Sequence, residues 1–230
     1  MPQGLVIKST GKNYDVLTAE HRIIQCQVRG KIRLEERTTT NPVAAGDTVD
    51  YTLENENEGN ITHIHQRKNY IIRKSVNLSK EAQIIATNLD QALLIVTLAR
   101  PQTTPGFIDR FLITADAYDI PATLIFHKMD QYDDDELTEV FDLIGIYEDI
   151  GYRCIKTSLE TSEGLSEVQH LLEGKISLIR GHSATGKSSI VNFFIPGKDL
   201  RIGEISESSN KGQHTTTFAE MHELTFNGFI

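Results

Sequence analysis

Residues 181–188 are the part of this chain whose types and spacing point most directly to chemistry. They read Gly-His-Ser-Ala-Thr-Gly-Lys-Ser, which matches G-x-x-x-x-G-K-[ST] at every fixed position. Glycines let backbone N–H groups close around phosphate oxygens, and the lysine adds a cation. We therefore expect a nucleoside phosphate to bind the loop residues Gly181, His182, Ser183, Ala184, Thr185, Gly186, Lys187, Ser188 and Ser189.

The flanks of this loop have the pattern that phosphate binding requires. Residues 175–180 read as a short apolar strand, and residues 187–194 read as a helix with one apolar face. A helix N-terminus attracts anions, so Lys187 is expected to reach the terminal phosphates as a catalytic group. The Ser188 hydroxyl is expected to ligate Mg²⁺. The alternative is a glycine-rich turn before an ordinary helix.

A second candidate segment, His127-Lys128-Met129-Asp130, directly follows the apolar run 122–126. It resembles the guanine-reading motif Asn-Lys-x-Asp of GTPases, with His in place of Asn. The Asp130 carboxylate could accept hydrogen bonds from guanine N1–H and N2–H₂, a pair of donors that adenine lacks. The alkyl stem of Lys128 would lie along the base. Taken alone, a Lys-x-Asp after a strand is often only a solvated turn.

Ser158 and Leu159 close the next expected strand and resemble the Ser-Ala segment whose backbone N–H meets guanine O6. The two segments together predict guanine binding by His127, Lys128, Met129, Asp130, Ser158 and Leu159. Their order is unusual, because the base-reading residues precede the phosphate loop in the chain. A circular permutation would still allow one site to assemble, since it joins the old ends and opens the chain elsewhere.

Two different patterns of apolar residues surround these motifs. Residues 1–72 contain five short candidate strands and a long polar loop, 29–47, which together predict an OB-type β-barrel. The loop carries Lys31, Arg33 and Arg37 and is the expected place for RNA, although a merely solvated loop is equally consistent. Residues 73–89 are expected to be a connector. From residue 90 to residue 230, continuous apolar runs alternate with helical spacing, which predicts a three-layer α/β domain.

Composition limits the classes of protein that fit. The chain has 230 residues, a net charge of −9 and two cysteines, with 39% hydrophobic and 24% charged residues. The acidic balance disfavours general nucleic-acid binding, and the cations are concentrated in the N-terminal third. No apolar run is long enough for a bilayer and no signal peptide is evident, so we expect a cytoplasmic protein without membrane contact.

The combination resembles the ribosome small-subunit-dependent GTPases of the RsgA family. The segments that carry the resemblance, besides the motifs above, are 40–47, 86–96 and 211–217. The resemblance covers nearly the whole chain. It implies an OB-type barrel followed by a circularly permuted P-loop GTPase domain, with hydrolysis of GTP to GDP and phosphate stimulated by the small ribosomal subunit during its late maturation. It also implies barrel contact with ribosomal RNA.

The resemblance assigns further roles to the segment that matches the first switch. Thr215 and Thr216 would complete the Mg²⁺ shell when the γ-phosphate is present, and His214 would orient the attacking water. An exposed loop histidine is the alternative for His214. Zinc is bound by a C-terminal Cys/His module in the family, and the ligands of that module are missing from this sequence. We expect a monomer.

Two departures from the family pattern matter. His127 stands where Asn normally bonds the base N7, so we expect guanine preference with GDP affinity lower by about 1–2 kcal/mol, the scale of one imperfect hydrogen bond. The motif Asp-x-x-Gly is not found after the first switch. Asp142–Gly145 fits the pattern but falls within an expected helix, whereas residues 225–230 read as the start of the strand that would deliver the motif. We interpret the chain as the front two-thirds of such a protein.

Three functions therefore remain open from sequence. The first is a GTPase in small-subunit assembly. The second is a non-hydrolysing RNA- or ribosome-binding module with a vestigial nucleotide site, which His127 and the missing Asp-x-x-Gly favour. The third is an ATP-dependent P-loop enzyme, in which Asp130 would not affect base preference.

Overall fold

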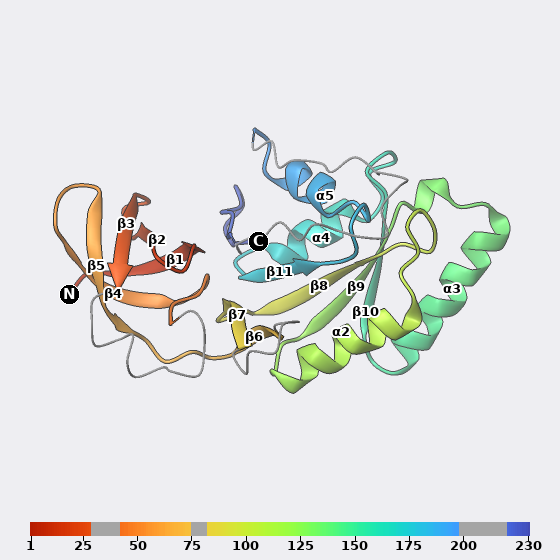
Figure 1. Cartoon of the computed structure of the whole chain (residues 1–230). Helices are drawn as coiled ribbons and strands as arrows, with labels where there is room; N and C mark the ends of the chain where they lie inside the picture. Colours follow the sequence, from red (N-terminus) through yellow and green to blue (C-terminus); the bar gives the residue numbers. More distant parts are fainter. Residues whose placement is uncertain (29–41, 75–81, 198–219) are drawn as a thin grey trace, which may run out of the picture. The chain divides into compact units, whose positions relative to one another are not determined.

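The computed structural model describes residues 1–28, 42–74, 82–197 and 220–230. The described residues fall into two compact units (Figure 1). Of the described residues, the first unit contains those between Met1 and Leu89 together with 220–222. The second unit contains residues 90–197 together with Glu223–Ile230.

The first unit contains a closed five-stranded barrel. Its strands are β1 (Gln3–Ser9), β2 (Tyr14–Thr18), β3 (Ile23–Val28), β4 (Thr48–Leu53) and β5 (Glu58–Ile64), closed in the order β1-β2-β3-β5-β4. Alternate residues point inward; in β3, for example, Ile24, Cys26 and Val28 are buried while their neighbours are exposed. The predicted OB-type barrel is confirmed.

A two-stranded hairpin is attached to the rest of the first unit through Thr87, which bonds the buried Asp47 carboxylate that is also paired with Arg67. The hairpin consists of β6 (Tyr70–Lys74) and β7 (Ala82–Thr87). Asp47 is fully buried and accepts hydrogen bonds from Arg67 Nε and Nη2 at 2.7 and 2.8 Å and from the Thr87 hydroxyl at 2.8 Å. Residues 73–89 were expected from sequence to be a connector, and the contacts of Thr87 attach that segment to the first unit.

The second unit is built on a parallel four-stranded sheet. Its strands are β8 (Gln91–Val96), β9 (Ala122–His127), β10 (Arg153–Thr157) and β11 (Ser177–Arg180), in the order β10-β9-β8-β11. Its helices are α2 (Pro105–Ala117), α3 (Asp134–Asp149), α4 (Leu165–Leu172) and α5 (Lys187–Phe194). Figure 1 shows α2 and α3 on one face of the sheet and α4 and α5 on the other. This confirms the predicted three-layer α/β architecture.

The alternating side chains of the sheet form two apolar layers. Leu93, Ile95, Ile125 and Ile155 pack with the buried faces of α4 and α5 in one cluster. Phe226 joins this cluster and meets Phe194 at a ring-centroid distance of 5.9 Å. The residues between them on β8 and β9 are also buried, and they point to the opposite face because strand side chains alternate. A sheet buried on both faces explains why its strands read as continuous apolar runs.

Helix α3 begins where the sequence places its cap. Asp133 accepts from the Glu136 N–H at 2.9 Å, and the Glu136 side chain accepts from the Asp133 N–H at 3.2 Å. This reciprocal pair satisfies two N–H groups that a helix start leaves unpaired. Residues Asp142–Gly145 lie inside this helix, as expected, and are therefore unavailable as a phosphate-sensing loop.

The expectation of a strand at residues 225–230 was wrong. The Leu224 N–H donates to the Gly228 carbonyl at 2.9 Å and closes a turn, and Phe229 makes a single parallel bridge to Ile176. A Cβ at Gly228, whose φ is +115°, would lie 2.7 Å from the Leu172 carbonyl oxygen. The backbone at Gly228 therefore turns where the apolar pattern suggested extension.

Within the described ranges, no helix is long and apolar enough to cross a membrane.

Candidate functional site

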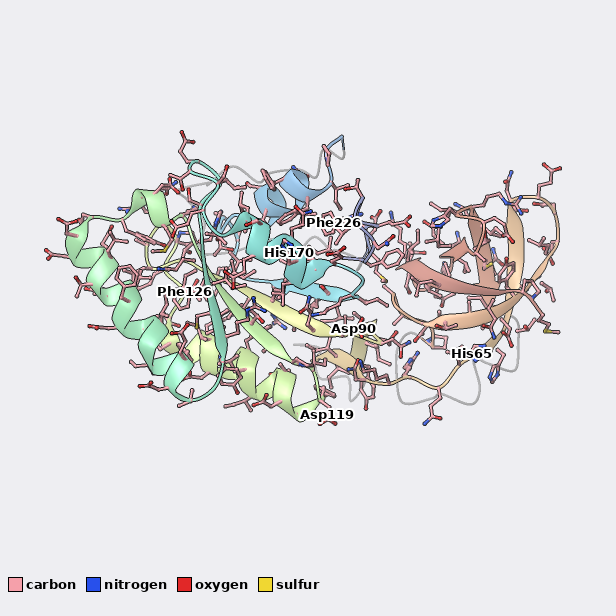
Figure 2. All side chains as sticks on the ribbon, turned by 180° about the vertical axis from the view of Figure 1, so that it is seen from behind. His65, Asp90, Asp119, Phe126, His170 and Phe226 are labelled. Atoms are coloured by element: carbon pink, nitrogen blue, oxygen red, sulfur yellow. The ribbon has the colours of Figure 1, made fainter. Side chains whose placement is uncertain are left out.

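The candidate residues gather at the carboxyl ends of the parallel strands. β9 ends at His127 and β10 ends at Thr157, and these two residues are direct partners in the sheet register. Phe126, labelled in Figure 2, is buried one residue before the end of β9. β11 ends at Arg180, immediately before the phosphate loop. Ligands of open α/β sheets bind at this edge.

The phosphate loop, Gly181–Gly186, requires glycine at its two ends for different reasons. A Cβ at Gly181 would lie 2.9 Å from both the Ile95 carbonyl oxygen and the Thr185 hydroxyl. Gly186 has a φ of +98°, a conformation that side-chain-bearing residues avoid. The Thr185 hydroxyl is buried in the loop and donates to the His182 carbonyl at 3.0 Å. These contacts hold the loop in shape without any bound anion.

Lys187 is the first residue of α5, and its ammonium group folds back over the loop. The Lys187 Nζ donates to the His182 carbonyl, and burial lowers the pKa of Lys187 from its usual value. Ser188 and Ser189 follow in the first helical turn and are half-buried, while Ser183 is exposed. The residues predicted to bind phosphate thus follow one another along the turn from β11 into α5.

Lys128 connects the predicted base-reading segment to the phosphate loop. Its φ of +65° redirects the chain at the end of β9 into the short 3₁₀ turn Met129–Gln131. Its Nζ donates to the Ala184 carbonyl at 3.0 Å and to the Arg100 carbonyl at 2.9 Å. Burial, followed by the positive charge of Arg100, lowers the pKa of Lys128. The two segments are therefore in direct contact, although the base-reading segment precedes the phosphate loop in the chain.

Asp130 is held by a hydrogen bond in the turn that follows β9. Its Oδ1 accepts from the Ser158 hydroxyl at 2.5 Å, and the Ser158 oxygen accepts in turn from the N–H groups of Glu160 and Thr161, both at 3.1 Å. Ser158 is fully buried, whereas the Asp130 side chain is exposed. The Ser158 N–H already donates to Glu163, while the Leu159 N–H has no partner in the described part of the chain.

His127 packs between β10 and the phosphate loop. Its side chain is 3% exposed, and Nδ1 lies 3.0 Å from the Thr157 hydroxyl. Burial, followed by the charge of Lys128, lowers the pKa of His127 to about 4, so the ring is neutral at neutral pH. Met129 beside it is buried and serves the packing of this turn.

Sequence profiles of known families match both units. The RsgA GTPase family matches residues 64–230, and the RsgA N-terminal domain matches residues 3–61. The chain belongs to the RsgA GTPase family. The RsgA resemblance that the motifs carried is thereby confirmed.

Relatives in the RsgA family align with nearly the whole chain. A protein named small ribosomal subunit biogenesis GTPase RsgA from Bacteroides fragilis is 46% identical over 99% of this chain and 74% of its own length. A protein of the same name from Flavobacterium johnsoniae is 47% identical over 99% of this chain and 71% of its own length.

Two solved structures are similar in fold. The crystal structure of YjeQ from Thermotoga maritima has a TM-score of 0.77 and 33% identity, and covers 99% of this chain and 72% of that one. YloQ, described as a circularly permuted GTPase, has a TM-score of 0.64 and 30% identity, and covers 85% of this chain and 65% of that one. These likenesses confirm the permuted arrangement that the motif order predicted.

Contacts of three residues around the predicted site were not expected from the sequence. The Tyr132 hydroxyl accepts from the Leu98 N–H at 2.9 Å and donates to the His127 carbonyl at 3.1 Å. The Phe107 ring stacks on the His182 ring with centroids 3.9 Å apart. Arg100 supplies the second carbonyl for Lys128. Nothing in the sequence marked Phe107, Tyr132 or Arg100 as a neighbour of the predicted motifs.

Some predicted functional residues lie outside the described part of the chain. His214, Thr215 and Thr216, assigned to water orientation and Mg²⁺, are among them. The basic loop residues Lys31, Arg33 and Arg37 are likewise outside it. Their roles stay predictions.

Proposed function

We propose that this chain binds and hydrolyses GTP and acts in the maturation of the small ribosomal subunit. The observation that carries the nucleotide part is the bridge from Lys128 to the Ala184 carbonyl, which joins a base-reading turn to a phosphate loop. The ribosomal part rests on relatives named small ribosomal subunit biogenesis GTPases, at 46–47% identity over nearly the whole chain.

Guanine recognition follows from the groups at the strand ends. Asp130 is exposed, and its bond from Ser158 orients the carboxylate, so it can accept from guanine N1–H and N2–H₂. The Leu159 N–H, which has no partner among the residues that the structure describes, is available to donate to guanine O6. Adenine presents an acceptor at position 1 and a donor at position 6, and would leave both groups unsatisfied. A site of buried or oriented polar groups rejects such a ligand strongly.

The phosphates would occupy the loop Gly181–Gly186. Their oxygens would replace some of the carbonyl oxygens that accept hydrogen bonds within the loop. Lys187 would leave the His182 carbonyl and donate to the terminal phosphate oxygens. The Ser188 hydroxyl fits Mg²⁺, which prefers oxygen ligands and shares phosphate oxygens and waters. Within the described ranges, no group of three or more His, Cys, Asp or Glu could hold a metal by itself. Bound Mg²⁺ would neutralise charge on the β- and γ-phosphates, and Thr215, Thr216 and His214 remain the proposed switch residues.

The barrel is the proposed contact with ribosomal RNA. The loop predicted at residues 29–47 carries Lys31, Arg33 and Arg37, and cations are the groups that bind phosphate backbones. A role on the small subunit would place the protein in the cytoplasm, and we propose that it acts as a monomer.

Competition of GDP and ADP for a bound fluorescent guanine nucleotide, with Mg²⁺ present, tests base recognition. We expect GDP to bind at least a hundredfold more tightly, about 2.7 kcal/mol. Asp130→Asn should remove most of that preference, whereas Asp119→Asn, at an exposed turn after α2, should not. Equal binding of GDP and ADP to the wild-type protein would refute guanine recognition.

Phosphate release with and without small ribosomal subunits tests the enzymatic part. We expect GTP hydrolysis that rises when subunits are added and is lost in Lys187→Ala. Absence of hydrolysis under both conditions would support the alternative, a non-hydrolysing ribosome-binding module. The names of the relatives do not favour that alternative.

A further inference from the structure

One nitrogen of the His127 ring is buried without a partner. The Nδ1 atom faces Thr157, but in the described part of the chain Nε2 makes no hydrogen bond. It lies against the phosphate loop, because a Cβ built on Gly186 would be 2.8 Å from Nε2 and 2.6 Å from Cδ2. With 97% of the side chain buried, the protonation of Nε2 decides what the ring can offer a ligand.

The contacts of Thr157 place the proton of the neutral His127 ring on Nδ1. The Thr157 hydroxyl donates to the Phe126 carbonyl at 3.4 Å, so its oxygen is left to accept from His127 Nδ1–H at 3.0 Å. In a neutral imidazole with Nδ1–H, Nε2 is an acceptor only.

This nitrogen is placed to meet the five-membered side of a bound purine. Asp130 takes the Watson–Crick edge, and the ribose and phosphates leave the purine from its five-membered ring. A side chain between the base-reading turn and the phosphate loop therefore faces N7 rather than N1. Guanine N7 is itself an acceptor. Two acceptors cannot form a hydrogen bond with each other.

We propose that this chain recognises guanine without reading N7, because His127 presents a bare acceptor where an amide would present a donor. The inference rests on the proposed guanine site and specifies which edges of the base it uses. His127 then acts as a specificity-determining residue by shape: it packs against Gly186 and leaves N7 unpaired. Selection of guanine over adenine then depends on Asp130 and the Leu159 N–H alone.

The test is to compare GDP with 7-deaza-GDP, in which N7 is replaced by C–H, and with ADP as a third competitor. Each nucleotide displaces a fluorescent guanine nucleotide from the full chain in the presence of Mg²⁺. For the wild-type protein we expect GDP and 7-deaza-GDP to differ by less than threefold and ADP to bind at least a hundredfold more weakly. In His127→Asn the amide can donate to N7, so GDP should become about tenfold tighter than 7-deaza-GDP.

The matched control is His170→Asn, the same substitution at an exposed histidine on α4, labelled in Figure 2, which should leave the ratio unchanged. A wild-type ratio of threefold or more in favour of GDP would overturn the inference, because Nε2 would then have to carry a proton. That result requires only the wild-type protein, so it holds even if His127→Asn does not fold. ADP binding as tightly as GDP would instead overturn the proposed guanine site, and the inference would fall with it.

Discussion

Lys128 shows how one side chain can assemble a site from two distant segments. A half-buried ammonium group needs acceptors, and the carbonyls of Ala184 and Arg100 supply them from the phosphate loop and from the loop after β8. The motif alone predicts that Lys128 contacts the guanine base. Its contacts in the structure make it equally a positioning residue for the phosphate loop.

Lys128→Ala should therefore weaken GDP binding by about thirtyfold, roughly 2 kcal/mol, the scale of a charge-assisted hydrogen bond. Isothermal titration with GDP measures the change. Lys156→Ala, which removes an exposed ammonium 4.9 Å from the Phe141 ring centroid, is the matched control and should leave GDP affinity unaltered. An affinity for GDP that is equal in Lys128→Ala and wild type would refute the bridging role.

His127 also predicts how stability depends on pH. The folded protein holds the pKa of His127 near 4, below the unfolded value of about 6.5, so the unfolded state binds more protons between these values. The stability that neutral His127 provides is complete above pH 6.5 and is lost as pH falls towards 4. Between pH 7 and pH 5 this amounts to about 2 kcal/mol.

Urea unfolding of wild type and His127→Asn at pH 7 and pH 5 measures that contribution. The loss on acidification should be smaller in His127→Asn by about 2 kcal/mol, because Asn does not titrate. The remaining histidines and carboxylates are common to both proteins and cancel in the difference. Parallel pH curves for the two proteins would contradict a buried neutral His127.

At the scale of elements, the turn from β11 into α5 is the most constrained connection in the site. Gly186 ends the loop at a φ of +98° and is the residue against which the His127 ring rests. The same position therefore needs both an unusual backbone conformation and the absence of a side chain. Gly197 has a φ of +96°, but a Cβ there would meet nothing within 4 Å.

Comparing Gly186→Ala with Gly197→Ala isolates the contact with His127, since the backbone strain is nearly the same. Gly197→Ala should cost about 1 kcal/mol in the free energy of unfolding. Gly186→Ala should cost about 2–4 kcal/mol and abolish GDP binding, because the ring must move. Chemical denaturation measures the free energy of unfolding, and GDP titration measures the affinity. Equal losses of stability in the two variants would show that the His127 ring moves aside at no cost.

Element-scale patterns were the part of the fold that sequence predicted best. The barrel strands alternate and the sheet strands are continuous apolar runs, so local periodicity identifies both. The phosphate loop was evident because its residues are consecutive. Tyr132, Arg100 and the Asp47–Arg67 pair were missed because each acts through partners far away in the chain, and spacing carries no signal for such contacts. The turn at 225–230 was misread because an apolar run does not reveal that Gly228 bends the backbone.

At the scale of the whole molecule, the described residues form two units with separate hydrophobic cores. The buried ion pair of Asp47 and Arg67 belongs to the first unit, whereas every described residue of the nucleotide site belongs to the second. Removing one member of a buried pair leaves the other charge without compensation. A defect in the first unit should therefore be separable from nucleotide binding.

Asp47→Ala should destabilise the first unit by about 3–5 kcal/mol while leaving the affinity for GDP within twofold of wild type. Circular dichroism during urea unfolding and GDP titration provide the two readouts. Asp50→Ala, which removes an ion pair of 2.9 Å with His65 at the barrel surface, is the control and should change stability little. If Asp47→Ala lost GDP binding in parallel with stability, the two units would have to fold as one.

The bridge from Lys128 to Ala184 also has a consequence for protein synthesis. The base-reading turn leaves the translating ribosome before the phosphate loop, so for a period Lys128 lacks its carbonyl partner and His127 lacks Gly186. Chains generally fold as units, from the N-terminus onward. Nascent chains that end before β11 should therefore be unable to retain a guanine nucleotide, and the nucleotide can act as a folding ligand only after α5 has emerged.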